Sequence, residues 1–151
     1  MLNPGIQSDE RFMREALKEA EQALEADEVP VGAVVVCNGR IIARAHNLTE
    51  RLNDVTAHAE MQAITAAANH LGGKYLDQCT LYVTLEPCIM CAGALAWAQL
   101  GKLVYGAADV KRGYTTVSGR ILHPKTQVKQ FVEAEKATDL LKNFFKTKRK
   151  N

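Results

Sequence analysis

The sequence lacks the features of a membrane or secreted protein. No apolar run approaches the roughly 20 residues that a helix needs to cross a bilayer. The N-terminal stretch becomes polar and acidic at Ser8, Asp9 and Glu10, so no signal peptide is visible. Neither sign of charge dominates, because 19 basic and 17 acidic residues leave a net charge of +2. We therefore expect a cytoplasmic protein without a membrane partner, and charge alone does not indicate a polyanionic ligand.

Cysteine is also scarce, and its placement argues against a disulfide framework. The chain has four cysteines, of which Cys88 and Cys91 follow Pro87 at a spacing of three. That spacing is typical of metal or redox chemistry in a reducing compartment. Cys37 and Cys79 border apolar runs, and we expect both to be small packing residues.

What is present is ordinary for a globular protein. Hydrophobic residues make up 47% and charged residues 24% of the chain, with no internal repeat and no linker. The length predicts a single domain over residues 1–151, with a basic C-terminal tail at about residues 146–151.

Periodicity and turn residues predict helices that alternate with strands. An apolar stripe beginning after Ser8 predicts a first helix, and Asn38-Gly39 predicts a tight turn between strands at 31–37 and 40–46. Further strands are expected at 80–84, 103–105 and 128–132, and further helices at 58–70, 88–100 and about 137–145. This order predicts the α/β class: a three-layer α/β/α sandwich with a central, mixed, five-stranded sheet.

Two short motifs carry most of the chemical information. His58, Cys88 and Cys91 are a set of three zinc ligands, which leaves one tetrahedral position open for water. Each motif is expected at a helix start, where backbone amides favour thiolates at the cysteines. His58 and Glu60 lie two residues apart, so they can share a target only at a helix end. Zinc-bound hydroxide with Glu60 as a proton shuttle would suit hydrolytic deamination of an amino-heterocycle.

Two other interpretations of these motifs remain open. Cys88 and Cys91 alone could form a redox pair, although such a pair does not need the His-x-Glu motif upstream. A fourth protein ligand would make the zinc site closed and structural, and His46 is the main candidate for that ligand.

At these residues the chain resembles the zinc nucleobase deaminases, whose signature is H-x-E followed by P-C-x-x-C. It resembles most closely the bacterial tRNA adenosine deaminases of the TadA type, which have a cytidine deaminase-like fold. The similarity extends from about residue 10 to residue 113, and more loosely over 140–149. The segments that match are Glu28–Val34, Thr56–Glu60, Thr80–Ala94 and Gly106–Asp109.

The resemblance implies conversion of adenosine to inosine at the wobble position of a tRNA anticodon loop, by a homodimer with one Zn²⁺ per subunit. It makes His58, Cys88 and Cys91 the zinc ligands and Glu60 the proton shuttle. It places Asn47, otherwise a turn former, and Pro87 against the substrate. The expected RNA contacts are Asp109, Lys111, Arg112, Lys148 and Arg149.

Some features depart from the family or leave alternatives open. The loop at residues 113–127 diverges, and its Tyr114 could stack on a base or pack on a dimer partner. Trp97 suits either a core or a dimer interface. A deaminase of a free base or nucleoside (guanine, cytosine or cytidine) is the main rival function. A zinc-stabilised RNA-binding module without enzymatic activity is the third possibility.

Overall fold

The computed structural model describes the backbone of residues 4–149 and the side chains of residues 8–148. The predicted mixed sheet of five strands is confirmed, with the strand order β2-β1-β3-β4-β5. β1 is antiparallel to both β2 and β3, whereas β3, β4 and β5 run parallel. The elements are α1 Pro4–Glu25, β1 Gly32–Cys37, β2 Arg40–His46, α2 Ala59–Leu71, β3 Cys79–Leu85, α3 Ile89–Trp97, β4 Lys102–Ala107, the 3-10 helix η1 Tyr114–Thr116, β5 Gln127–Lys129 and α4 Ala134–Arg149.

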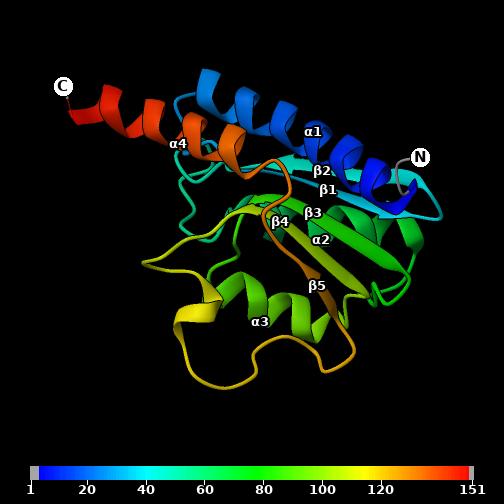
Figure 1. Cartoon of the computed structure of the whole chain (residues 1–151). Helices are drawn as coiled ribbons and strands as arrows, with labels where there is room; N and C mark the ends of the chain where they lie inside the picture. Colours follow the sequence, from blue (N-terminus) through cyan, green and yellow to red (C-terminus); the bar gives the residue numbers. More distant parts are fainter. Residues whose placement is uncertain (1–3, 150–151) are drawn as a thin grey trace.

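Helices cover both faces of the sheet, as the sequence predicts. α1 and α4 lie together on one face, and α2 and α3 lie on the other (Figure 1). Each strand connects the two layers, because successive side chains point to opposite faces. Val34 and Val36 pack against α1 with Phe12 and Met13.

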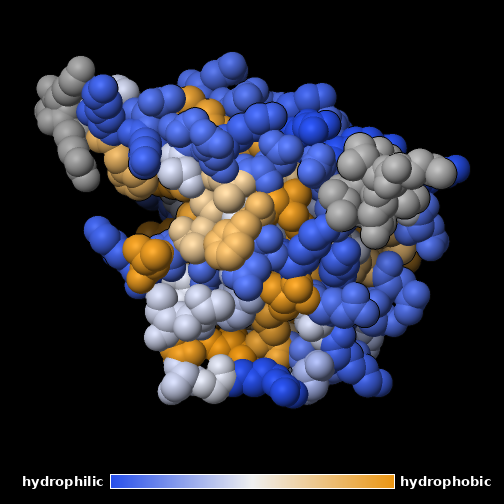
Figure 2. All heavy atoms as spheres, viewed as in Figure 1, coloured by the Kyte–Doolittle hydropathy of each residue, from blue (hydrophilic) through white to orange (hydrophobic). Residues whose placement is uncertain are grey.

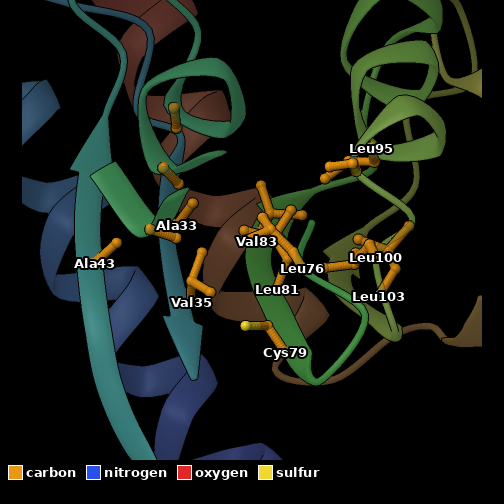
Figure 3. Packing of buried hydrophobic residues seen from close by; sticks show 14 of the residues in the cluster. Ala33, Val35, Ala43, Leu76, Cys79, Leu81, Val83, Leu95, Leu100 and Leu103 are labelled. Carbon is orange, nitrogen blue, oxygen red and sulfur yellow. The ribbon is translucent and has the colours of Figure 1, made fainter. Parts of the chain in front are cut away.

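The opposite face holds the larger core. Ala33 and Val35 of β1 point to this side with Leu81 and Val83 of β3, as Figure 3 shows. Ala59, Ala63 and Ala67 of α2 and Leu95 of α3 complete the layer. The small alanines let α2 approach the sheet closely, which holds its first turn against the ends of the strands.

The hairpin between β1 and β2 has the predicted two-residue turn. Asn38 and Gly39 adopt φ values of 54° and 75°, the left-handed conformation that a type I′ turn requires. One β-bulge between Val35 and Val36 interrupts the pairing of the two strands.

Several element boundaries differ from the prediction, and three of them have a clear local cause. α1 begins at Pro4, not Ser8, because proline suits the first helical position. α3 ends at Trp97 instead of Leu100, since Gln99 adopts a left-handed φ of 55°. β5 is the short strand Gln127–Lys129, and the left-handed φ of Phe131 at 66° ends any continuation to residue 132. None of these shifts moves the motifs.

The topology brings the two motif helices to one end of the sheet. β3 and β4 end side by side, where Leu85 pairs with Ala107. α2 and α3 then begin at Ala59 and Ile89, next to this edge. The described residues include no helix both long and apolar enough to cross a membrane.

Candidate active site

The three predicted metal ligands converge between two helix starts. His58 is the N-cap residue of α2 and Cys88 that of α3, each with an extended backbone. The Nδ1 atom of His58 lies 3.7 Å from Sγ of Cys88 and 3.5 Å from Sγ of Cys91. Among the residues that the structure describes, these form the one group of three such side chains able to share a metal, with ligand atoms within 4.8 Å of one another.

The spacing of these atoms fits a tetrahedral metal site. Zn–S bonds of 2.3 Å and Zn–N bonds of 2.0–2.1 Å at tetrahedral angles separate the ligand atoms by about 3.6–3.8 Å. One imidazole nitrogen and two sulfurs are also the donor types that zinc prefers.

The environments of the two thiols shift their pKa values in opposite directions. Hydrogen bonds from Cys91 and His58 lower the pKa of Cys88 to about 4, which favours the thiolate form that binds metals. The hydrogen bond to Cys88, together with burial, raises the pKa of Cys91. The hydrogen bond with Cys88 also raises the pKa of His58. A metal bound by all three residues must therefore displace protons, and its affinity falls as the pH falls.

Glu60 lies in the first turn of α2, beside the three ligands. Only 4% of the Glu60 surface is exposed, and this burial raises the pKa of the Glu60 carboxyl to about 7. A carboxyl group with a pKa close to neutrality can both accept and release a proton during turnover.

Asn47 connects the end of the hairpin to α2. Its Oδ1 accepts a hydrogen bond from the backbone N–H of Ala59 at 2.8 Å. This contact satisfies one of the free amides at the helix start. Because the oxygen is engaged there, the amide NH₂ group is what Asn47 offers to the cleft that it lines.

A large cleft opens over these residues. Its volume is about 1150 Å³, and its lining includes His58, Glu60 and Cys88 at the metal-binding end. The far wall comes from α4, with Leu141, Lys142, Phe145 and Lys146. Figure 2 shows the surface hollowed between α4 and the loop of residues 107–112. The cleft therefore runs from the buried ligands to a basic, partly aromatic rim.

The predicted RNA contacts fall into two groups. Asp109, Lys111 and Arg112 line the cleft. Lys148 instead pairs with Asp27 at 2.6 Å and is not among the lining residues. The side chain of Arg149, with residues 150 and 151 of the predicted tail, lies outside the described part of the chain. Pro87 is buried behind the lining, and its carbonyl accepts a hydrogen bond from Tyr114 at 2.9 Å.

The structure also places the residues for which alternatives were open. His46 faces Glu19 of α1, with Nδ1 3.1 Å from Oε1, and it does not join the ligand group. Tyr114 packs edge-to-face on Tyr105 of its own chain, with the ring centroids 6.4 Å apart. Trp97 is 85% exposed, so the core alternative for this residue is wrong.

Two buried carboxylates border the site, and sequence reasoning assigned them no role. Glu28 accepts hydrogen bonds from the loop after β2, and Glu86 accepts them from the loop after β4. For Glu86 the available signal was a single acidic residue between apolar neighbours, in Leu85-Glu86-Pro87, whereas Glu28 directly follows Asp27 and carries no such signal. Such a residue is seldom buried without partners, but the sequence does not reveal which partners it has.

Comparison with known proteins places this arrangement among deaminases. The family model for MafB19-like deaminase matches residues 7–149. The tRNA-specific adenosine deaminase of Aquifex aeolicus (strain VF5) is 48% identical over 146 residues, which cover 94% of this chain and 97% of the relative.

Solved structures give the same fold. One, from a study of A-to-I editing by tRNA:A34 deaminases at the wobble position of transfer RNA, has a TM-score of 0.82 and 44% identity. The match covers 87% of this chain and 99% of that chain. The guanine deaminase of Bacillus subtilis has a TM-score of 0.63 and 40% identity, over 71% of this chain and 66% of that chain.

Proposed function

Because this chain belongs to the deaminase family that includes the tRNA-specific adenosine deaminases, we propose that it converts adenosine to inosine at the wobble position of a tRNA anticodon. The observation that carries the proposal is the cleft in which His58, Cys88, Cys91 and the buried Glu60 meet below a basic rim. The reaction consumes water and releases ammonia. The presence of tRNA in the cytoplasm makes that compartment the proposed location.

His58, Cys88 and Cys91 would hold one zinc ion per subunit. Their donor set and spacing support this assignment, and Cys91, which is fully buried, anchors the side away from the cleft. When bound, zinc makes water a nucleophile at neutral pH. Three protein ligands would leave one coordination position for water, and His58 and Cys88 line the cleft from which water and substrate would enter.

Glu60 would carry the proton. It takes one proton from the attacking water and delivers it to a ring nitrogen of adenine. It then takes the second proton from the hydroxyl group added to the ring carbon and gives it to the amine, which departs as ammonia. Burial favours this cycle because a carboxyl group with a pKa of about 7 changes its protonation state at little cost near neutral pH.

Asn47 would orient the base. Its oxygen is held by Ala59, so its NH₂ group donates and the base must present an acceptor. Pro87 lies behind the lining, so its proposed effect on the substrate is through the position of Cys88, the next residue.

The rim of the cleft supports an RNA substrate. The volume of about 1150 Å³ exceeds the roughly 300–1,000 Å³ of ordinary small-molecule sites, which leaves room for nucleotides beside the flipped base. Lys111, Arg112, Lys142 and Lys146 supply positive charge there, and Asp109 shapes the loop that carries the first two. Lys148 and Arg149 would extend the contact along the end of α4.

We also propose that the protein is a homodimer. The outer face of α3 presents Met90 and Trp97, which are seven residues apart and 37% and 85% exposed. Residues seven apart lie on the same side of a helix, so these side chains form one apolar stripe.

A deaminase of a free base is the second candidate. The likeness to guanine deaminase of Bacillus subtilis favours it, although that match covers less of both chains than the match to the tRNA:A34 deaminase structure.

One assay separates the two functions. An anticodon stem-loop RNA with a wobble adenosine is incubated with the zinc-loaded protein, and inosine is measured in the RNA. Free guanine, cytosine, cytidine and adenosine run in parallel, with ammonia as the readout. We expect inosine in the RNA alone. Ammonia from a free base with unchanged RNA would contradict the proposal in favour of the second candidate.

A truncated variant that lacks residues 147–151 tests whether the basic tail binds RNA. This deletion takes away Lys148, Arg149 and Lys150, so we expect RNA turnover to fall, and to fall more steeply at higher salt. An unchanged rate on RNA would exclude the tail from the RNA interface.

A further inference from the structure

Two buried carboxylates, Glu28 and Glu86, hold the two loops that flank the cleft. Each accepts two backbone N–H groups and one threonine hydroxyl. For Glu28 the donors are the amides of Glu50 and Arg51, at 3.0 and 2.8 Å, and the hydroxyl of Thr49, at 3.3 Å. The exposed fractions are 1% for Glu28 and 3% for Glu86, so both act inside the protein.

Glu86 anchors the loop after β4 at two points. Its Oε1 accepts the amide of Asp109 at 3.1 Å. Its Oε2 accepts the amide of Thr115 at 3.0 Å and the hydroxyl of the same residue at 2.8 Å. The space around the carboxylate is filled, because a Cβ on Gly113 would collide with it. Both ends of the segment between Asp109 and Thr115 are thus fixed to one side chain.

Asp109 in turn fixes the backbone of the two basic residues, Lys111 and Arg112. Its Oδ1 accepts the amides of Lys111 and Arg112, at 3.1 and 3.0 Å, and its carbonyl accepts the amide of Gly113 at 2.9 Å. Lys111 and Arg112 are exposed and line the cleft. The hydrogen bonds to Asp109 fix their backbone, so their side chains are free to contact a substrate. A buried, fully hydrogen-bonded carboxylate is a rigid support for such a turn.

We propose that Glu86 is a positioning residue for the RNA substrate: it fixes residues 108–113 so that Lys111 and Arg112 meet the phosphates beside the flipped adenosine. This inference rests on the proposed function. Glu86 acts through the loop and does not touch the reacting atoms. Its loss should weaken the capture of RNA while leaving the chemical step of bound RNA intact.

A double-mutant cycle on the zinc-loaded protein tests the proposal. The variants are Glu86→Gln, the pair Lys111→Ala with Arg112→Ala, and all three changes together, assayed on the anticodon stem-loop. Glutamine has the same shape but turns an NH₂ group toward donors that need an acceptor. We expect Glu86→Gln to raise KM for the RNA about tenfold with kcat close to the wild-type value. Removing the two charges should raise KM in the wild-type background and add little in the Glu86→Gln background.

Glu28→Gln is the matched control. It disturbs the same number and kind of hydrogen bonds in the loop after β2, so it controls for a general loss of stability. In that background the loss of Lys111 and Arg112 should keep its full effect on KM. Additive effects in the Glu86→Gln background, or a fall in kcat with unchanged KM, would overturn the proposal.

Two further readouts keep the outcomes distinct. Hydrogen exchange at the amides of Asp109 and Thr115 should accelerate in Glu86→Gln, and unchanged protection would overturn the positioning role. If Glu86→Gln fails to fold, Thr115→Val removes one donor only, and its KM should shift in the same direction by a smaller factor. Failure of the proposed function has a different signature, since the wild-type protein would then form no inosine in the RNA.

Discussion

At the scale of single residues, we propose that Asn47 serves both helix formation and substrate binding. Its oxygen accepts the amide of Ala59 at the start of α2, and the same side chain lines the cleft. A cap of this kind contributes about 0.5–2 kcal/mol to stability. This helix carries Glu60 and follows His58, so the amide of Asn47 fixes the start of the element on which the proposed chemistry depends.

The change Asn47→Asp separates these two roles. Aspartate keeps the acceptor for Ala59 and favours the helix N-terminus, so the melting temperature should stay close to the wild-type value. It has no NH₂ donor, so inosine formation should fall at least about tenfold. Asn47→Ala is the comparison, because it should lower both stability and activity. Full activity in Asn47→Asp would remove the amide from substrate recognition.

The residues of the site were predictable to different degrees. The metal-ligand group His58, Cys88 and Cys91 follows from residue type and spacing, because few other tasks need this set. Asn47 had a proposed role only through resemblance, since asparagine in a loop is usually a turn residue. Glu86 was not assigned a role, because its partners lie 23 and 29 residues away in the sequence. Local patterns do not encode such distant contacts.

At the scale of elements, α1 is attached to the sheet by a buried acid. Asp9 accepts a hydrogen bond from the hydroxyl of Tyr82 at 2.7 Å and pairs with Lys129 at 2.8 Å and Lys102 at 3.4 Å. Burial by itself raises the pKa of Asp9. The hydrogen bonds from Lys129 and Tyr82, with the charge of Lys102, outweigh burial and lower the pKa below 3.8.

This network predicts an acid-sensitive attachment of α1. A carboxyl group whose pKa is depressed in the folded state adds stability above its unfolded pKa, and that stability is lost as the pH falls through the folded pKa. Asp9→Asn should therefore lower the free energy of unfolding by about 1–3 kcal/mol at neutral pH. The difference from wild type should shrink as the pH falls below about 4.

Denaturant titrations at several pH values measure this difference. A chelator present throughout keeps metal loss from contributing to the pH dependence. A difference between Asp9→Asn and wild type that stays constant down to about pH 3 would contradict the role of the Asp9 charge.

Elements were more predictable than their ends. The Asn38-Gly39 turn and the stop of α2 at Gly72, which has a φ of 70°, have local causes that a sequence displays. The ends of α3 and β5 depend on left-handed backbone at Gln99 and Phe131, residue types that rarely adopt it. The left-handed conformations of Gln99 and Phe131 depend on tertiary packing, so a local sequence pattern does not predict them. The role of Asp9 was also not predictable. Its residue type suits a first helical turn, but the structure shows it buried and bonded to side chains of the sheet.

At the scale of the whole molecule, we propose that two copies of the chain associate. Trp97 on α3 is 85% exposed, and Met90 lies on the same side of this helix and is 37% exposed. Large exposed aromatic residues are typical of interfaces. We therefore expect sedimentation analysis to give twice the mass of one chain.

The change Trp97→Glu should shift this equilibrium toward the monomer. A charge placed in an apolar interface carries a desolvation cost that truncation to alanine lacks, so Trp97→Glu should dissociate the dimer more than Trp97→Ala. The circular dichroism of both variants should match wild type, because the side chain contributes little to the core. A monomeric wild-type protein, or an intact Trp97→Glu dimer, would argue against this interface.

We propose that one metal centre and Glu60 together make this chain an RNA deaminase. The most direct test measures zinc per chain and inosine in the anticodon stem-loop on the same preparations of wild type, Glu60→Gln and Cys88→Ala. We predict about one zinc with activity in wild type, and about one zinc without activity in Glu60→Gln. We predict loss of both zinc and activity in Cys88→Ala. An active Glu60→Gln protein, or full zinc occupancy in Cys88→Ala, would contradict the account.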